Sequence, residues 1–466
     1  HRASDLVVSI HWLYDRTGES WLVDFGTKIL SQDYDWMTHF GDFQYTEKLA
    51  SAETELCTHV VNNAHGLKHP ALRYRHTGAD ADASAVTQFL DTLDTYHGQV
   101  TGMFSGDEHF AGKSPSQGTE LCAVVEFMFS LEQFVQILGQ VKHADRLERV
   151  AYNALPAAIS PDMWSHQYDQ QANQAVCKIS EDRVYTTNSP DANIFGLMPG
   201  CVCCTSNMHQ GWPKFVSHLW MRSPDGGLAA VAWGPCEVHT RVADTAVHID
   251  VQTDYPFDER IDIAIQPDQP MIFPLHLRIP SWCRDATVRV GDEEPVSVEA
   301  GAFHVLERKW DGTVGVTLIL TAAVEIERRW NGAGSILRGP LVYALAIEEQ
   351  WRRITSFPAE AWTKGVTDSD YGKRYRDFPL GDWEVHPGSP WNVALDLDLA
   401  APETSVRFQR RAMRERPFSP QHAPVLGQVR GRLLPSWGLE HNAAAPPPPS
   451  PVRSTEPLHW LLLLPY

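Results

Sequence analysis

The sequence predicts a multidomain α+β protein, with a helical first part followed by antiparallel β-sandwiches. Two observations carry this prediction. Amphipathic runs with helical spacing fill the first half, and short β-rich runs separated by turn residues fill the second, with the change at Ser223–Gly227. The 466 residues can bury several cores. We therefore expect a helical domain over residues 1–222, a β-sandwich over 223–330 and a second β-sandwich over 331–466.

A weak internal repeat runs through the helical part. Leu13–Glu19 is matched in residue type by Tyr74–Asp80, and more loosely by Ile137–Asp145. In each, an amphipathic run ends at a short turn and a second helical run follows. Gly18 and Gly78 are predicted to be helix C-caps, because glycine adopts the left-handed conformation without strain. The repeat favours stacked αα-hairpins, which an α-solenoid and a barrel of helix pairs would both produce.

The clearest single helix is predicted over residues 121–141. Its apolar residues recur at spacings of three and four, which marks a broad buried face. A partner helix is expected over residues 144–155, with Asp145 in its first turn and Pro156 ending it. Together they form a helical hairpin.

The second half is predicted to be built from short strands. Two-residue alternation between turn residues marks six of them: Leu228–Trp233, Val247–Gln252, Ile261–Ile265, Leu275–Ile279, Thr287–Val290 and Val314–Leu320. Leu341–Leu345 is expected to be an early strand of the second sandwich. The apolar run at 461–466 has the pattern of a strand that is cut short.

Composition limits the classes of partner. The net charge of −19 argues against nucleic acid and against an anionic membrane surface. No run of about 18 apolar residues is evident, so we expect no membrane span. The 16 tryptophans and 13 tyrosines are weakly consistent with a neutral carbohydrate substrate, although aromatic residues more often pack cores. No signal-peptide pattern begins the chain. The compartment stays open, with the cytoplasm slightly favoured over secretion.

Three of the eight cysteines fall within four positions: Cys201, Cys203 and Cys204. Neighbouring thiols bridge poorly to each other, because a disulfide requires a particular Cα separation and Cβ direction. The cluster therefore indicates soft ligands for a metal such as zinc. The alternative is that these residues are small apolar fillers on a buried strand.

Further ligands are suggested by Glu120 and Cys122, which precede and begin the predicted long helix. Within a regular helix the two side chains would point to nearly opposite sides, whereas an extended approach segment would place them together. With Cys203 and Cys204 they supply one carboxylate and three thiolates, a tetrahedral count. The alternative is that Glu120 favours the helix dipole and Cys122 fills the core. Both interpretations stay open on the residues alone.

Three further segments carry polar groups suited to chemistry. Asp107 and Glu108 lie in a glycine-flanked loop, and a carboxyl kept protonated there could donate to a leaving oxygen, although adjacent acidic residues are usually solvated. His59 begins a helix with several polar groups; alone, such a histidine is more often structural. The aromatic and amide-rich loop 164–174, which contains Gln171, is either plain surface or a sugar-binding wall.

Several motifs taken together resemble a known family. They are Gly106–His109, Gln117–Cys122, Leu147–Asn153, Cys201–Cys204, Leu277–Cys283 and Arg338–Tyr343. The chain resembles the zinc- and cysteine-dependent β-L-arabinofuranosidases of glycoside hydrolase family 127 over nearly its whole length. The resemblance implies an (α/α)6-type barrel followed by two β-sandwiches. It also implies a retaining glycosidase acting on a furanosidic sugar, with non-reducing terminal β-L-arabinofuranose as the expected substrate.

The resemblance also implies roles for particular residues. Zinc would be held by four of them: Glu120, Cys122, Cys203 and Cys204. Cys203 would also be the nucleophile, and Glu108 the general acid/base, with Asp107 as its rival. His59 would lie in the sugar pocket, and Gln171 is expected to bind substrate from the amide-rich loop. The expected partner is an arabinofuranoside-containing glycan, and a homodimer is allowed for.

Two departures from the family pattern stand out. A barrel of six helix pairs needs twelve helices, whereas residues 1–222 hold about seven or eight, so we expect a barrel that is truncated at its N-terminus. Thr205–Asn207 stands where many relatives carry prolines, which suggests a different sugar specificity.

Two other functions are weighed against the glycosidase. In the main alternative, the thiolates form a closed structural zinc site in a non-catalytic protein that binds glycan or protein. A zinc peptidase is disfavoured because the sequence lacks His-Glu-x-x-His.

Overall fold

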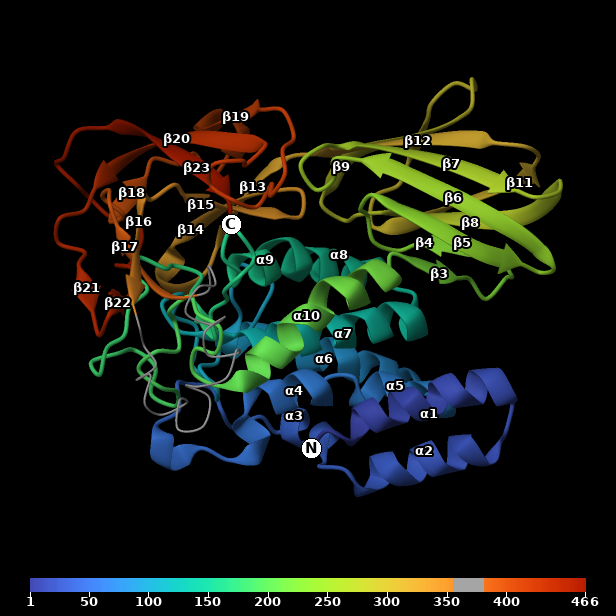
Figure 1. Ribbon diagram of the computed structural model, residues 1–466, viewed down its shortest axis with the longest axis horizontal. Coiled ribbons are helices and arrows are strands. Elements are labelled where there is room, and N and C mark those ends of the chain that lie inside the picture. The colour runs from blue at the N-terminus through green and yellow to red at the C-terminus, as the bar shows by residue number, and fades with distance from the viewer. Residues whose placement is uncertain (355–380) are drawn as a thin grey trace, which may run out of the picture.

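The computed structural model describes residues 1–354 and 381–466. A helical part occupies one side of the molecule, and two β parts lie next to each other across its other side (Figure 1). The chain is therefore a multidomain α+β protein, as predicted. Both β parts follow the helical part in the sequence. Each of them contacts helices that are distant from it in the sequence.

The helical part, all of whose residues 1–222 are described, contains eight helices of seven residues or more. These are α1 (Ala3–Thr17), α2 (Trp21–Gln32), α4 (Val60–Gly66), α5 (His69–Thr77), α6 (Asp80–His97), α7 (Leu121–Leu138), α8 (Val141–Arg149) and α10 (Val202–Ser217). Shorter elements join them: α3 (Trp36–Gly41), a π-helical turn at Val150–Ala154, α9 (Leu155–Ala157), and a two-stranded pair of β1 (Thr119–Glu120) with β2 (Asp169–Gln170).

Glycine ends three of these helices, as the sequence predicts for two. Gly18, Gly78 and Gly139 all adopt the left-handed conformation, and the amide of Gly18 donates to the carbonyl of Tyr14 over 2.8 Å. Two details of the predicted hairpin are wrong. The helix begun at Leu121 ends at Leu138 rather than at Val141, which opens the next helix. Its partner runs past Pro156, because proline is tolerated in the first turn of the short α9 that follows the π-helical turn.

Helix α7 is the centre of the helical part. It contacts α4, α5, α8 and α10, and most of its residues are buried. By length and hydropathy it is also the one described helix that could span a membrane, although Glu126 and Glu132 interrupt its apolar residues. Buried residues make up 78% of this stretch, as in the core helix of a globular domain.

The first β part packs two sheets face to face. One sheet has the order β10-β9-β12-β7-β6-β5 and the other β11-β8-β4-β3. Their strands are β3 (Trp220–Arg222), β4 (Leu228–Ala230), β5 (Cys236–Val242), β6 (Thr245–Thr253), β7 (Arg260–Pro267), β8 (Met271–Ile279), β9 (Cys283–Val290), β10 (Val296–Val298), β11 (Ala302–Trp310) and β12 (Val314–Ala322). All six predicted strands are present. The pairing is not wholly antiparallel, because β4 runs parallel to β8.

The second β part differs from the predicted sandwich. Its described residues form one seven-stranded sheet in the order β13-β14-β15-β23-β20-β18, with β19 also paired to β20, and two two-stranded pairs. The main sheet contains β13 (Val324–Arg328), β14 (Gly334–Arg338), β15 (Leu341–Leu345), β18 (Val393–Leu395), β19 (Val406–Arg410), β20 (Val425–Leu433) and β23 (His459–Pro465). The small pairs are β16 (Glu349–Ile354) with β17 (Asp382–Pro387), and β21 (Leu439–Glu440) with β22 (Ala443–Ala444). The rest of the predicted second sandwich, 355–380, lies outside the described residues.

A buried ion-pair network joins the helices to the first β part. Arg278 of β8 is fully buried and pairs with Asp145 and Glu148 of α8. The backbone amide of Trp233 donates to Glu148 over 2.6 Å, and the hydroxyl of Tyr255 donates to the same carboxylate. Asp145 therefore contacts the sandwich from the middle of α8, rather than capping the first turn of a helix as expected. Charges buried at this depth are tolerated because each has a partner.

A single asparagine joins the helices to the second β part. The Asn153 side chain accepts a hydrogen bond from the amide of Val342 and donates to the carbonyl of Pro340, each over 2.8 Å. Backbone groups at the start of β15 are thereby satisfied by a residue of the helical part. Since buried amides and carbonyls must be paired, this contact fixes how the second β part lies against the helices.

Candidate functional site

Two helix N-termini meet at the candidate site. Glu120 ends strand β1 and is the N-cap of α7, with extended backbone, and Cys122 follows in the first turn. Cys201 is the N-cap of α10, and Cys203 and Cys204 lie in that helix's first turn. The predicted extended approach to Glu120 is confirmed. Free amides and the positive end of the helix dipole favour anionic side chains at both positions.

The four predicted zinc ligands come together in the structure. One ligand atom from each of Glu120, Cys122, Cys203 and Cys204 lies within 4.8 Å of all the others. The Sγ atoms of Cys122 and Cys204 are 3.4 Å apart. Glu120, Cys122 and Cys204 are buried, whereas Cys203 is partly exposed. One carboxylate and three thiols supply four donors of the kinds that bind zinc in proteins.

Protonation at the cluster shows why a cation fits it. Hydrogen bonds from the Cys122 and Cys204 thiols hold the pKa of Cys203 far below its usual value, so charge collects on this sulfur. Burial, with the negative charges of Glu108 and Cys203, raises the pKa of Glu120. Its Oε2 atom is buried without a hydrogen-bond partner. A buried, unpaired carboxylate oxygen beside a thiolate is costly, and a divalent ion would satisfy both.

The loop that carries Glu108 is held tightly against this cluster. The backbone amide of Glu120 donates to the carbonyl of Gly106 over 3.1 Å. A Cβ atom on Gly106 would lie 2.0 Å from the Val60 side chain, so only glycine fits there. Glu108 has a φ of 125°, a strained conformation for a residue with a side chain. Its carbonyl accepts from the Val60 amide over 2.9 Å. Strain of this kind concentrates at functional sites.

His59 lies beside Glu108. It is the N-cap of α4, where its Nδ1 accepts from the amide of Asn62, and its Nε2 lies 2.7 Å from Oε1 of Glu108. A β-bridge between His59 and His109 fixes the two backbones next to each other. The prediction that His59 begins a helix is confirmed, and the structure adds its contact with the loop carboxylate.

Tyr168 connects the parts of the site, and sequence reasoning missed it. Its hydroxyl donates to Glu108 and lies 3.1 Å from Oε1 of Glu120 and 3.7 Å from Sγ of Cys203. The residue immediately precedes β2, whose Asp169 pairs with Glu120. The signal was its place in the aromatic, amide-rich loop 164–174.

Comparisons with known proteins identify the family of the chain. Residues 3–217 match the family model "Beta-L-arabinofuranosidase, GH127 catalytic domain", and residues 227–322 match "Beta-L-arabinofuranosidase, GH127 middle domain". The chain belongs to glycoside hydrolase family 127. The helical part and the first β part each match a domain of this family.

Similar individual proteins include a curated relative and solved structures. The relative is a non-reducing end β-L-arabinofuranosidase of Bifidobacterium longum subsp. longum, 23% identical over 284 residues, which are 56% of this chain and 40% of the relative. The chain therefore spans less than half of this relative's length. A GH127 β-L-arabinofuranosidase from Geobacillus stearothermophilus T6 superimposes with a TM-score of 0.67 at 17% identity, covering 99% of this chain and 69% of that one. The GH127 β-arabinofuranosidase BT3674 gives 0.63 at 16% identity, covering 99% and 65%.

The two acidic residues of this GH127 chain's loop lie in different surroundings. Asp107 is buried, which raises its pKa, and its Oδ2 accepts from the amide of Thr187 over 3.4 Å. Burial also pushes the pKa of Glu108 upward, but hydrogen bonds from His59 and Tyr168 outweigh it, so this pKa is lowered. The structure thus brings Glu108, rather than Asp107, into contact with the groups that surround Cys203.

Two further residues, Cys201 and Gln171, are not among the four clustered donors. Cys201 is exposed, and its thiol is one of the groups beside Cys203 that lower the pKa of that residue. Gln171 is fully buried, and its side-chain amide donates to the carbonyl of Ser116 over 2.6 Å. A role for Gln171 in substrate binding stays a prediction.

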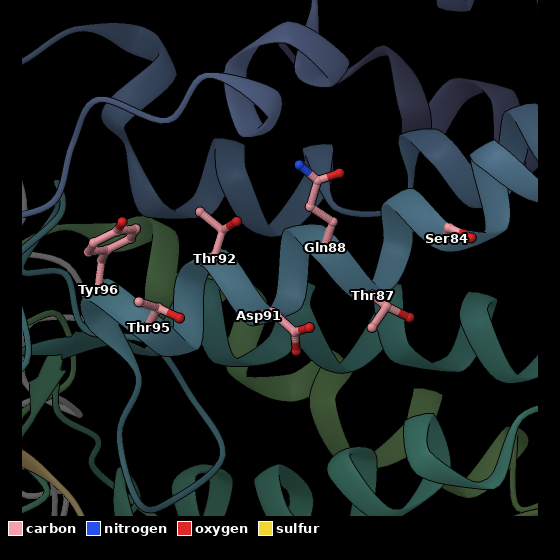
Figure 2. A pocket seen from close by; sticks show the side chains of 7 residues that line it. All are labelled: Ser84, Thr87, Gln88, Asp91, Thr92, Thr95 and Tyr96. Atoms are coloured by element: carbon pink, nitrogen blue, oxygen red, sulfur yellow. The ribbon is translucent and has the colours of Figure 1, made fainter.

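Hollows are also present elsewhere on the surface of the GH127 chain. One, of about 560 Å³, follows a single face of α6 from Ser84 to Tyr96, and its lining side chains all come from that helix (Figure 2). It is an open surface depression that shares no residue with the thiolate cluster. The chemistry of the donor groups, rather than cavity size, identifies the candidate site.

Proposed function

We propose that this protein is a retaining glycoside hydrolase with a cysteine nucleophile and a glutamate acid/base. One observation carries the proposal: Tyr168 links Cys203 to Glu108 at the edge of a donor set suited to zinc. The substrate class follows from the GH127 relatives, whose names specify β-L-arabinofuranosidase. The expected substrate is a glycan that ends in non-reducing β-L-arabinofuranose.

Zinc is the proposed cofactor. Glu120, Cys122, Cys203 and Cys204 would hold it, because their donor atoms are clustered and a carboxylate oxygen among them lacks a partner. When bound, the ion would keep the Cys203 sulfur deprotonated at neutral pH while moderating its nucleophilicity. Backbone amides at the starts of α7 and α10 favour the same anionic state.

The first step would transfer the sugar to the enzyme. The Cys203 thiolate attacks the anomeric carbon, a carbon–sulfur bond forms, and the bond to the aglycone oxygen breaks. Glu108 gives its proton to that oxygen, so the aglycone leaves as a neutral alcohol. Before substrate binds, Tyr168 and His59 orient the Glu108 carboxyl toward the cluster.

The second step would release the sugar. Glu108, now a carboxylate, takes a proton from water, and the water oxygen attacks the anomeric carbon while the carbon–sulfur bond breaks. Two displacements at one carbon give net retention of configuration, with sulfur in place of the usual carboxylate nucleophile.

The pKa of Glu108 must change between these roles. In the structure, hydrogen bonds from His59 and Tyr168 outweigh burial and lower it, which suits the base. A sugar hydroxyl that takes over either partner would leave burial as the main influence, and burial raises the pKa of a carboxyl. We therefore propose that substrate binding itself prepares the acid.

We further propose that the helical part belongs to an (α/α)6-type barrel. Its eight longer helices and the likeness to GH127 structures support this assignment. The division at about residues 222 and 330 is proposed on the same basis, with the qualification that β13 precedes residue 331 and joins the sheet of the second β part.

The test compares three variants on a chromogenic β-L-arabinofuranoside. Cys203→Ala and Glu108→Gln should each reduce turnover by at least about 100-fold while folding normally. Cys236→Ala, a thiol of β5 far from the donor set in sequence, is the matched control. Wild-type turnover by Cys203→Ala would end the nucleophile assignment. Loss of stability on zinc removal from a protein with no glycosidase activity would favour the structural zinc protein instead.

A further inference from the structure

The β5–β6 hairpin carries a cluster of ligand-type side chains on its outer face. Strands β5 and β6 run antiparallel, with Glu237 opposite Asp250 and His239 opposite His248 (Figure 1). Side chains two residues apart on a strand share a face, and directly opposed residues share it too. All four side chains therefore project from one surface of the sandwich. Nothing in the proposed glycosidase mechanism uses them.

The two imidazoles and one carboxylate are close enough to bind one ion. A ligand atom from each of Glu237, His239 and His248 lies within 4.8 Å of the other two. The two imidazole rings are stacked, with centroids 4.5 Å apart and an interplanar angle of 13°. The His239 Nε2 lies 3.6 Å from a Glu237 carboxylate oxygen, and both side chains are well exposed.

His248 supplies the observation that separates a site from an ordinary surface pair. Its Nε2 is shielded from water and has no hydrogen-bond partner. A shielded ring nitrogen without a partner is destabilising, and stacking alone does not satisfy it. The neighbouring Asp250 is not a partner of this nitrogen either; its Oδ2 accepts from the Gln252 side chain over 2.9 Å.

We propose that Glu237, His239 and His248 form a second metal site, separate from the thiolate cluster. Imidazole and carboxylate ligands suit divalent zinc, nickel and copper, whereas magnesium and calcium prefer oxygen ligands alone. Three protein ligands leave a coordination position for water. An ion there would join β5, the last strand in the order of its sheet, to β6 through side chains as well as backbone. This inference does not depend on the proposed glycosidase activity.

Zinc counting on the full chain tests the site. After equilibrium dialysis against excess Zn²⁺, the wild type should hold one more zinc per chain than His239→Ala/His248→Ala. His459→Ala, which removes an exposed histidine from another strand, should bind as the wild type does. Equal zinc content in the wild type and the double variant would overturn the proposal.

Two further variants distinguish the hairpin site from the thiolate cluster and test the role of Glu237. Cys122→Ala/Cys204→Ala breaks the thiolate cluster, so it should lose the other zinc and retain the hairpin one; failure of either site is thus seen separately. Glu237→Gln keeps both imidazoles and the strand shape. It should weaken zinc binding at the hairpin without altering the circular dichroism spectrum, and unchanged binding would remove Glu237 from the site.

Discussion

The Sγ atom of Cys203 lies 3.7 Å from the hydroxyl oxygen of Tyr168, and that hydroxyl donates to Glu108. A residue of a loop thereby connects the first turn of α10 to the strained loop before β1. Groups that orient reacting side chains in this way usually cost activity when removed, even though they form no bond to substrate themselves. Tyr168 is accordingly the most informative residue to change.

Tyr168→Phe should lower turnover of a chromogenic β-L-arabinofuranoside by about 10- to 100-fold. The ring still packs against Gly200, so the fold should persist, while Glu108 loses one of the hydrogen bonds that lower its pKa. Because Glu108 acts as a protonated acid in the first step, the alkaline limb of the pH profile of kcat/KM should shift upward. Tyr96→Phe on the surface of α6 is the control. A Tyr168 variant with a wild-type rate and pH profile would contradict the proposed role.

Zinc removal should loosen the junction of α7 and α10. Chelation is expected to lower Tm, because an ion that binds only the folded state stabilises it by about 4 kcal/mol when free zinc exceeds Kd 1,000-fold. Adding back zinc should restore Tm. Differential scanning calorimetry of Cys204→Ala supplies the comparison: this variant should start with a lower Tm and respond much less to chelator. An equal response in both proteins would show that zinc stabilises the chain from elsewhere.

Glu132 should make stability fall as pH rises. It is buried within α7, where the Nδ1 atom of His218 lies 3.1 Å from one carboxylate oxygen, and burial raises its pKa from 4.5 to about 8. The folded state therefore binds a proton that the unfolded state has released between these two values, so the free energy of unfolding decreases across this window.

Glu132→Gln should remove that slope. The variant is expected to exceed the wild type at pH 8 by more than about 1 kcal/mol, with the difference vanishing toward pH 5. Urea unfolding at several pH values measures this, and Glu19→Gln, an exposed position between α1 and α2, is the control. Parallel curves for Glu132→Gln and the wild type would refute the assignment.

Arg278→Met should be strongly destabilising. The substitution leaves Glu148 buried without its guanidinium partner, at a cost of about 3–5 kcal/mol. Arg284→Met, close by in the same β part, breaks an exposed pair with Asp285 and should cost less than about 1 kcal/mol. Denaturant midpoints compare the two. Similar small effects would mean that the helices and the first β part are held together by other contacts.

Much of the site could be predicted because its residues come in short motifs. Glu120 and Cys122 are two apart, and Cys203 adjoins Cys204, so each pair is visible before the fold is known. Their convergence required more, because 82 positions separate Cys122 from Cys204. Tyr168 carries no such spacing. Its hydroxyl reaches the site only because β2 pairs with β1, a contact of two residues a side.

The fold, like the site, could be predicted where the sequence carries a local pattern and not where it lacks one. Strands with buried, β-branched residues were predicted, whereas β5 and β11 were missed because their outward positions carry histidine, arginine and glutamate. The parallel pairing of β4 with β8 leaves no local pattern at all. The register between distant strands depends on how whole sheets pack. The local sequence of a strand does not encode that packing.

The contacts of Asn153 with the start of β15 bear on the order in which the chain folds during synthesis. The two backbone partners of Asn153 across this junction, Pro340 and Val342, are synthesised nearly 190 residues later, so these two contacts can form only after β15 has been made. The hydrogen bond from the Asn153 amide to the Arg149 carbonyl, by contrast, lies within the helical part. A ribosome-bound chain stopped before β15 would contain all four residues of the thiolate cluster. It would lack the contacts between Asn153 and the second β part. The residues of the thiolate cluster are therefore all synthesised before the helical part can close against the second β part.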